Sequence, residues 1–511
     1  MKQGQLIPVN TPGKWGINRQ EENALLGPEY AVRADNAVID SAGRLGIRNG
    51  WQNQTSTPIP GAPAVRNVFT FRDNTGATPV LEDIVVWDGG IGSGLGSPSV
   101  TNISGTLNVT GGDSYLCNFN NVVIGSAPGE KLSTYNGTGV FTEIAGSNVG
   151  NGVVLCAAGR VWHASTDGTT LHYSDLLDHT TYGAGSIVDM LSVWGETDRI
   201  TGLAFFNSAL IIFSERQVVF YTDGQGSELG IDPLQMYVSD IVAGVGCVSR
   251  WSIKAAGEDD LLFCSSHGIT SIGRLIAERS NPTVTLTETV RDYLVEKLAK
   301  QIDKDQIRAE YNEGGGYYVL SLPTAGVSFY LSMKHRYQGA RGQLLAPVLE
   351  WTYAPTALNY SLESGLLTGN AGLVGKYTGA SDNGTPYAWD AKFGWTDFQA
   401  AGSMLIPKQF GALILTEAQI TVNLSWAFDF STATKTSQIT TPAIGSAASE
   451  FNISEYAIAE WGGGAVNLFR LSTPTTGQGQ YVQLTVGVAE VTAQLAIQSL
   501  SLFTKVGRKI I

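Results

Sequence analysis

The sequence predicts an all-β protein that consists of a β-propeller of about six or seven blades and a β-sandwich-like platform domain. Three observations support this prediction: abundant turn chemistry, short strand patterns that recur along the chain, and longer strand patterns near its C-terminus. Gly accounts for 61 of the 511 residues and is scattered beside Asn, Asp, Ser or Thr, a composition typical of many tight turns. A chain of this length exceeds one ordinary core, so we expect two or three domains.

From about residue 60 the chain alternates apolar runs with short polar turns. The stretch "GVVLCAAGRVWHASTDGTTLHYSD", for example, places strand patterns on both sides of Asp167-Gly168, a strong signal for a type I′ hairpin turn. Similar units recur at varying intervals. Small antiparallel sheets repeated around an axis leave only short exposed edges, and this arrangement is the β-propeller.

Residues 285–300 carry one convincing helix pattern. Val290, Tyr293, Leu294 and Leu298 would share a face of this helix, and the preceding threonines could cap its N-terminus. We expect the helix to pack at a junction between blades.

The strand patterns lengthen after about residue 385, where segments such as "QITVNLSWAFDFS" alternate apolar and polar residues over a longer span. This change predicts a propeller over residues 56–380 and a sandwich or platform domain over residues 381–511. We expect the N-terminal hairpin segment, residues 1–55, to join the platform.

The charge balance limits the classes of partner. The chain has 45 Asp and Glu against 32 Lys and Arg, a net charge of -13, whereas phosphate contacts require Lys and Arg. An acidic wall past which DNA slides without binding remains compatible with this balance. No run reaches the roughly 18 apolar residues of a membrane span, and the first residues lack the apolar region of a secretion signal.

Motifs for catalysis or cofactor binding are weak. The glycine-rich stretch after Trp87 lacks the G-x-G-x-x-G spacing of a dinucleotide site, so we expect a surface loop there. The chain has five histidines, and none lies near a strand-turn-helix nucleophile elbow. We therefore expect no enzymatic activity and no bound cofactor or metal.

His163 and His172 form the most specific local pattern. A two-residue turn at Asp167-Gly168 would place the two imidazoles opposite each other on paired strands. Such a pair could bind a metal or titrate below neutral pH. Because no third ligand is identifiable nearby, we favour a structural pair.

The four cysteines, Cys117, Cys156, Cys247 and Cys264, lie in apolar runs without the close spacing of a zinc site. We interpret them as buried free thiols in preference to disulfides.

The stretch "LLGPEYAVRADNAVIDSAGRLGIRNGW" resembles the start of the tail nozzle proteins of short-tailed bacteriophages, also called tail tubular protein B or packaged-DNA stabilisation proteins. The family motif is matched by six residues: Ala34, Asn36, Gly43, Leu45, Arg48 and Gly50. Residues 198–224 and 242–273 resemble two consecutive blades of this family, and residues 395–415 resemble a stretch near its C-terminal domain. The resemblances follow the family's order along the chain, although many members are longer.

The resemblance implies a virion protein with a propeller and a platform, assembled as a ring of six copies that extends the tail channel below the portal and adaptor. Such a ring would retain packaged DNA, conduct it during ejection and carry no enzymatic activity. The implied partners are the tail adaptor and a tail fibre, spike or needle. Arg44, Arg48 and Trp51 become candidate assembly contacts, and the two arginines would make ion pairs within or between subunits.

The C-terminal residues "TKVGRKII" add a second set of candidate assembly contacts, Lys505, Arg508 and Lys509. A basic segment that ends in two isoleucines could pair along a neighbouring subunit, or it could be a terminal strand of its own sandwich. The alternative class of protein is a receptor- or carbohydrate-binding phage tail fibre or spike, or a stand-alone propeller that is a lectin or a hydrolase. A propeller hydrolase would need convergent carboxylates or a His-Asp pair, and no such pattern is recognisable.

Overall fold

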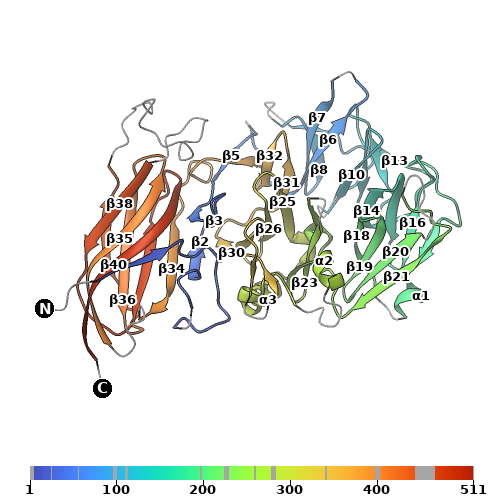
Figure 1. The fold of residues 1–511 in the computed structure, drawn as a ribbon. Helices are drawn as coiled ribbons and strands as arrows, with labels where there is room; N and C mark the ends of the chain where they lie inside the picture. The colour runs from blue at the N-terminus through green and yellow to red at the C-terminus, as the bar shows by residue number, and fades with distance from the viewer. Residues whose placement is uncertain are drawn as a thin grey trace.

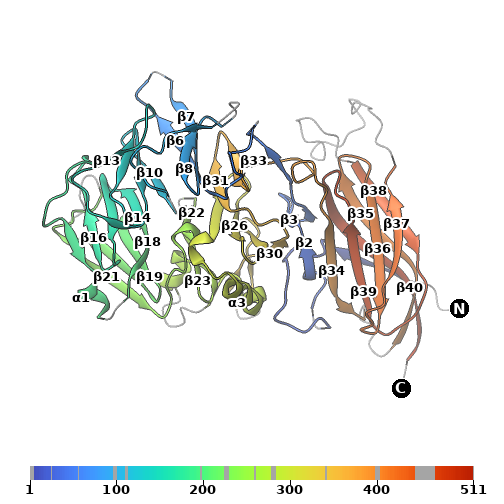
Figure 2. The ribbon, with the colours of Figure 1, turned by 180° about the vertical axis from the view of Figure 1, so that it is seen from behind.

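The computed structural model describes most of the chain: residues 5–24, 26–55, 57–76, 78–95, 100–109, 113–195, 198–223, 230–257, 260–277, 284–339, 342–397, 403–442 and 467–509. It confirms the all-β class, with a ring of small sheets at one end and a sandwich of long strands at the other (Figure 1). Both chain ends lie at the sandwich end of the molecule (Figures 1 and 2).

In the described part of the chain, six small antiparallel sheets and one end of a nine-stranded sheet form seven propeller blades, which agrees with the upper estimate from the sequence. The first four blades each take four consecutive strands. Their bounds are Val65–Asp73, Val80–Trp87, Gly90–Ser93 and Thr101–Asn102 (β6 to β9); Tyr115–Phe119, Val122–Ser126, Ser133–Tyr135 and Thr142–Glu143 (β10 to β13); Gly150–Ala157, Arg160–Ser165, Thr170–Tyr173 and Ile187–Asp189 (β14 to β17); and Ile200–Phe206, Ala209–Ser214, Gln217–Asp223 and Met236–Ala243 (β18 to β21). In each, the first strand is the innermost one and contacts the neighbouring blades.

The last three blades depart from this pattern. The fifth has three strands, the sixth ends in β30, and the seventh takes its outer strand, β5, from the N-terminal segment. Their bounds are Lys254–Ala256, Asp260–Ser265 and Gly268–Ser271 (β22 to β24); Arg308–Asn312, Tyr317–Leu322, Val327–Ser332 and Val348–Trp351 (β25 to β27 and β30); and Ala357–Ser361, Gly365–Gly369, Val374–Tyr377 and Trp51–Asn53 (β31 to β33 and β5).

Apolar side chains between adjacent blades close the ring. Distinct clusters of buried residues lie between consecutive sheets, and one of them joins Val65 and Val68 of the first blade to Ala357 and Leu367 of the seventh. At the same junction the Thr356 hydroxyl donates a hydrogen bond of 2.6 Å to the Val65 carbonyl oxygen. The blades therefore bury their apolar faces against one another.

Local turn chemistry explains why consecutive strands pair. Asn120-Asn121, Ala158-Gly159 and Asn207-Ser208 each join the first two strands of a blade, and both residues of each pair have positive φ, as a type I′ turn requires. Asp167-Gly168 differs, because Gly168 alone of the two has positive φ, although the strand register is the expected one.

The glycine-rich stretch after Trp87 is a hairpin, not a surface loop. Gly90–Ser93 forms the buried strand β8, which pairs with β7. A Cβ at Gly92 would lie 2.2 Å from Val100, so only glycine fits there.

The expected helix is shorter than predicted. A 3₁₀ turn, Glu288–Val290, precedes α3, Arg291–Lys300, and the buried residues include Leu294 and Leu298. No side chain caps this N-terminus; instead, the Thr287 hydroxyl accepts a hydrogen bond of 3.2 Å from the Ile269 amide. The helix contacts the fifth blade, and its Tyr293 packs 6.0 Å from Phe329 in the sixth, which confirms its place at a blade junction. The other helices are α1, Leu191–Trp194, and α2, Ile272–Ala277.

Two of the four cysteines differ from the prediction. Cys117 on β10 and Cys156 on β14 form a disulfide between the second and third blades, whereas Cys247 and Cys264 are free and buried. Adjacent blades bring their Cα atoms within 6.0 Å across a sequence separation of 39 residues. This proximity depends on the ring and is invisible in the local sequence.

Long strands build the C-terminal sandwich. One sheet contains β40 (Leu495–Lys509) between β35 (Ser403–Thr416) and two N-terminal strands, β1 (Gln5–Asn10) and β4 (Leu45–Ile47). The remaining strands of this sheet are β3, Ala37–Ile39, and β38, Asn467–Pro474. The second sheet contains β34, β39, β36 and β37, with bounds Trp389–Thr396, Val482–Val488, Thr421–Phe428 and Lys435–Thr440.

The N-terminal segment joins both parts of the molecule. Strand β2, Ala31–Asp35, pairs with β34 of the sandwich on one side and with β30 of the sixth blade on the other. Strand β5 belongs to the seventh blade, so residues 1–55 are divided between propeller and sandwich. A continuous sheet therefore runs from the sixth blade into the sandwich.

Candidate functional site

The residues that carry the sequence resemblance gather at the junction between propeller and sandwich, which we call the joint (residues 31–51 with the segments that contact them). Ala34 and Leu45 are fully buried there. Asn36 is the residue at which the chain leaves β2 and enters β3, and its φ of 56° is a left-handed conformation that Asn tolerates.

The side chain of Asn36 ties three distant segments together. Its amide nitrogen donates to the Thr352 hydroxyl at 2.9 Å and to the Ala388 carbonyl at 2.7 Å. Its amide oxygen accepts from Arg48 Nε at 2.9 Å and from the Thr352 amide at 3.0 Å. Asn36 therefore uses its full hydrogen-bonding capacity inside the joint.

Arg48 is fully buried at the centre of the joint. Its Nη1 and Nη2 donate to the two carboxylate oxygens of Asp382 at 2.8 and 2.7 Å, and its guanidinium lies 3.9 Å from the ring centre of Tyr387. Nη1 also donates to the Asn49 carbonyl at 2.8 Å. The sequence predicts an ion pair of Arg48 either within a subunit or between subunits, and the pair with Asp382 lies within the chain.

Gly50 and Trp51 connect the joint to strand β5 of the seventh blade. A Cβ at Gly50 would lie 2.0 Å from the Ser381 carbonyl oxygen, so a larger residue would separate the two segments. Trp51 is 8% exposed and its ring stacks 6.1 Å from that of Tyr353. Trp51, a candidate assembly contact, is thus occupied by contacts within its own chain.

Arg44 lies at the tip of the β3–β4 turn, where Gly43 has a φ of 77°. Its Nε donates to the Asp40 carboxylate at 2.6 Å, and both side chains are 23% exposed. Arg44 is thus a more accessible arginine than Arg48, and it faces a cleft.

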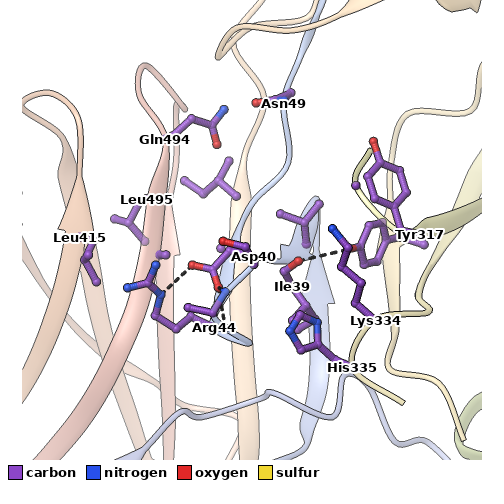
Figure 3. A pocket seen from close by; sticks show the side chains of 18 of the residues that line it. Ile39, Asp40, Arg44, Asn49, Tyr317, Lys334, His335, Leu415, Gln494 and Leu495 are labelled. Carbon is purple, nitrogen blue, oxygen red and sulfur yellow. Dashed lines mark hydrogen bonds and ion pairs between the residues drawn. The ribbon is translucent and has the colours of Figure 1, made fainter. Parts of the chain in front are cut away.

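This cleft, of about 610 Å³, separates the β3–β4 hairpin and the ends of β35 and β40 from the sixth blade (Figure 3). Asp40, Arg44 and Gln494 line one side, while Lys334 and His335 line the other (Figure 3). Lys334 Nζ donates to the Gly314 carbonyl at 3.1 Å. The walls therefore offer charged groups of both signs to a polar partner.

His335, which lines the cleft, contacts a serine, and a serine beside a histidine is the arrangement of some nucleophilic active sites. His335 Nδ1 lies 3.1 Å from the Ser332 hydroxyl. Ser332 is 2% exposed and is not one of the residues that line the cleft. A buried hydroxyl cannot attack a substrate, so the geometry favours a structural hydrogen bond.

His163 and His172 are paired as the sequence predicts. They stand opposite each other on β15 and β16, with ring centres 5.1 Å apart. Burial, together with the smaller effect of the neighbouring His172, lowers the pKa of His163 to about 3. Among the described residues, no group of three or more His, Cys, Asp and Glu side chains is placed to hold a metal ion.

The C-terminal basic residues continue the last strand. Lys505 pairs with Ile406 and Lys509 pairs with Ser403 on β35, so the backbone of residues 504–509 belongs to its own sandwich. Lys505 is exposed. Ile510 and Ile511, which the assembly prediction also used, lie outside the described residues.

The partners of Arg48 were not recognisable from sequence. Asp382 lies in the turn "GASDNG", which reads as an ordinary loop, and Tyr387 lies in the next short segment. No spacing rule connects residues 334 positions apart, so the ion pair emerges only when the N-terminal segment crosses the last blade.

The fold and the joint define a class: a seven-bladed propeller joined to a β-sandwich by its own N-terminal segment. No protein family model matches the chain, and no curated protein sequence matches it. No helix in the described part of the chain is long and apolar enough to cross a membrane.

Solved structures with similarity to the chain include propellers. The designed Ika8 protein is 13% identical over 64% of this chain and 99% of its own, with a TM-score of 0.35. Hsv2 from Kluyveromyces lactis is 9% identical over 52% of this chain and 82% of its own, with a TM-score of 0.31. BamB from Moraxella catarrhalis is 10% identical over 73% of this chain and 97% of its own, with a TM-score of 0.34. Similarity at this level carries no argument about function.

Proposed function

We propose that this chain is a structural subunit of the tail nozzle of a short-tailed bacteriophage. In this proposal several copies, six by resemblance to the family, form a ring below the portal and adaptor. The ring retains packaged DNA in the virion and conducts it during ejection. A tail fibre, spike or needle would attach to the same assembly.

One observation carries the proposal: five of the six residues shared with the nozzle motif are buried, hydrogen bond or allow a close backbone approach in the joint. Asn36 and Arg48 hydrogen bond across it, Gly50 permits the close approach of residue 381, and Ala34 is buried within it. A motif that served a local turn alone would not place its residues around one buried ion pair. The resemblance therefore concerns the part of the molecule that makes two domains one body.

A continuous connection between the domains suits a ring subunit. Strand β2 continues the sheet from β30 into β34, and β5 completes the seventh blade, so the chain connects the two bodies through backbone hydrogen bonds. In such a subunit, contacts made at the sandwich would reach the propeller through these paired strands.

The charge of the chain also agrees with a conduit for DNA. With a net charge of -13, its surface lacks the excess of Lys and Arg that drives phosphate binding by counterion release. A channel formed by such subunits would let DNA pass without holding it.

The test is the assembly state of the purified full chain. Native mass spectrometry and negative-stain microscopy, alone and with the adaptor protein of the same virus, should reveal a closed ring with a central hole. A chain that stays monomeric at high concentration and does not bind the adaptor would refute the nozzle assignment. A monomer that binds defined glycans would instead support the carbohydrate-binding alternative.

A further inference from the structure

Three arginines from different blades lie close together where inner elements of these blades begin. Arg66 is the second residue of β6, Arg308 is the first residue of β25, and Arg250 opens the 3₁₀ turn Arg250–Ser252 that precedes β22. These elements belong to the first, fifth and sixth blades, and the ring brings them together. We call Arg66, Arg250 and Arg308 the axial arginines.

Arg308 is held firmly and has all its nitrogens engaged. It is 2% exposed, and its guanidinium lies 4.2 Å from the ring centre of Trp251. Its Nε donates to the Arg66 carbonyl at 2.7 Å, and its Nη1 donates to the carbonyls of Asp305 and Ile307. Its Nη2 donates to the Asp113 carboxylate at 3.3 Å. These contacts therefore hold the Arg308 side chain in one position within the cluster.

Arg250 is nearly as buried but is poorly satisfied. It is 7% exposed, and Nη1 donates a hydrogen bond of 3.3 Å to the Asn151 carbonyl. Its Nε and Nη2 are buried and have no hydrogen-bond partner in the described part of the chain. The same holds for Nε of the half-buried Arg66. A buried guanidinium without an acceptor is costly, because water no longer compensates its charge.

The carboxylates nearby do not balance this charge. Asp113 is the ion-pair partner of Arg308, and Glu310 is paired with Lys254 at 2.7 Å. Burial raises the pKa of Asp113, while the positive charges of Arg308, Arg250 and Arg66 act in the opposite direction. Arg66, Arg250 and Arg308 thus all act on the Asp113 carboxylate, while the nearby Asp305 is exposed to solvent.

We propose that the axial arginines form a binding site for a compact oxyanion, the chemistry shared by phosphate and carboxylate groups. The anion would accept hydrogen bonds from Nε and Nη2 of Arg250 and from Nε of Arg66. The guanidinium fork matches two oxygens of such a group, and a charge-assisted pair of this kind is stronger than a neutral hydrogen bond. Arg308 and Asp113 act as positioning residues. The site is formed by blade residues that are separate from the joint, and it does not depend on ring assembly.

The experiment measures binding of inorganic phosphate and of acetate to the full chain by isothermal titration calorimetry, with the ionic strength held constant by sodium chloride. Saturable binding to one site per chain is expected for at least one of these anions. Arg250→Gln should weaken it by about tenfold or more, the loss expected for charge-assisted hydrogen bonds. Arg199→Gln is the control, because the Arg199 side chain is 68% exposed and pairs with Glu215. The affinity of this variant for the anion should equal that of the wild type.

Thermal unfolding measures the stability of each variant and so separates a loss of anion binding from a failure to fold. Without added anion, Arg250→Gln should melt no lower than the wild type, because the substitution removes an uncompensated buried charge. With phosphate or acetate, the wild type should gain stability and Arg250→Gln should not. Preference for phosphate or for acetate identifies the oxyanion that the site selects. Absence of saturable binding by either anion, or equal binding by the wild type and Arg250→Gln, would overturn the proposal.

Discussion

Arg48 and Asp382 are 334 positions apart in the chain and share two hydrogen bonds of 2.8 and 2.7 Å in the interior of the joint. The arginine is fully buried, while the aspartate side chain is 21% exposed. The N-terminal segment is thereby attached to the loop that follows the last propeller strand. The stability of the connection between propeller and sandwich should depend on this pair.

Replacement of Arg48 by Met should destabilise the protein by about 3 kcal/mol, because it leaves the Asp382 carboxylate without its ion-pair partner and removes one hydrogen bond to Asn36 in a largely buried site. Urea unfolding followed by tryptophan fluorescence measures the loss. Arg33→Met is the matched control, since Arg33 forms a similar two-bond pair with Asp390 but is 49% exposed. Its cost should stay near 1 kcal/mol or below. Equal losses for the two variants would contradict the central role of Arg48.

Replacement of Gly50 by Ala should separate β5 from the seventh blade, because the new Cβ would lie 2.0 Å from the Ser381 carbonyl oxygen. Overpacking against backbone costs about 1–3 kcal/mol or more. Hydrogen exchange should accelerate at residues 51–53 and at their partners in β33. Gly185→Ala serves as the control, since its Cβ would meet no atom within 4 Å, and unchanged exchange at β5 in Gly50→Ala would refute the prediction.

The burial of His163 beside His172 should make the free energy of unfolding depend on pH in the acid range. The pKa of His163 falls to about 3 in the folded chain, mainly through burial, so the unfolded chain, with its ordinary pKa near 6.5, binds more protons below that pH. Stability contributed by neutral His163 is complete above about pH 6.5 and is lost as the pH falls toward 3. At pH 5 the loss amounts to about 2 kcal/mol.

Melting temperatures between pH 4 and pH 7 check this expectation. His163→Phe should flatten the pH dependence and melt higher than the wild type at pH 5. His172→Phe should have a smaller effect, because His172 is half-buried and the negative charge of Asp167 opposes the lowering of its pKa by burial. A wild-type slope that persists in His163→Phe would assign the pH dependence to other groups.

Deletion of residues 505–511 should lower the melting temperature, because it removes the strand that pairs with Ile406 and Leu405 at the end of β35. Leu405 is fully buried and would become exposed. Lys505→Ala, which keeps the backbone pairing, should melt like the wild type. If the deletion instead abolished ring assembly at an unchanged melting temperature, the tail would be an assembly contact.

Features that depend on near neighbours in the chain were predictable. Turn pairs such as Asn120-Asn121 adopt the positive φ that hairpins need, and alternating strands after residue 385 form the sandwich. The facing of His163 and His172 follows from the strand register around one turn. Helix α3 was located, although not its capping, because Thr287 bonds to a strand that is distant in the sequence.

The amino-acid sequence by itself determined the strands, the turns and the repeated blades, since these depend on backbone preferences and on apolar periodicity within about ten residues. Tertiary structure decided which distant residues meet. Closure of the ring brought Cys117 to Cys156 and Arg250 to Arg308, and the return of the N-terminal segment brought Arg48 to Asp382. The physical reason is that the burial of apolar faces between blades determines how the blades are arranged in space. Polar and charged side chains that this arrangement buries must then find partners among whichever residues lie beside them.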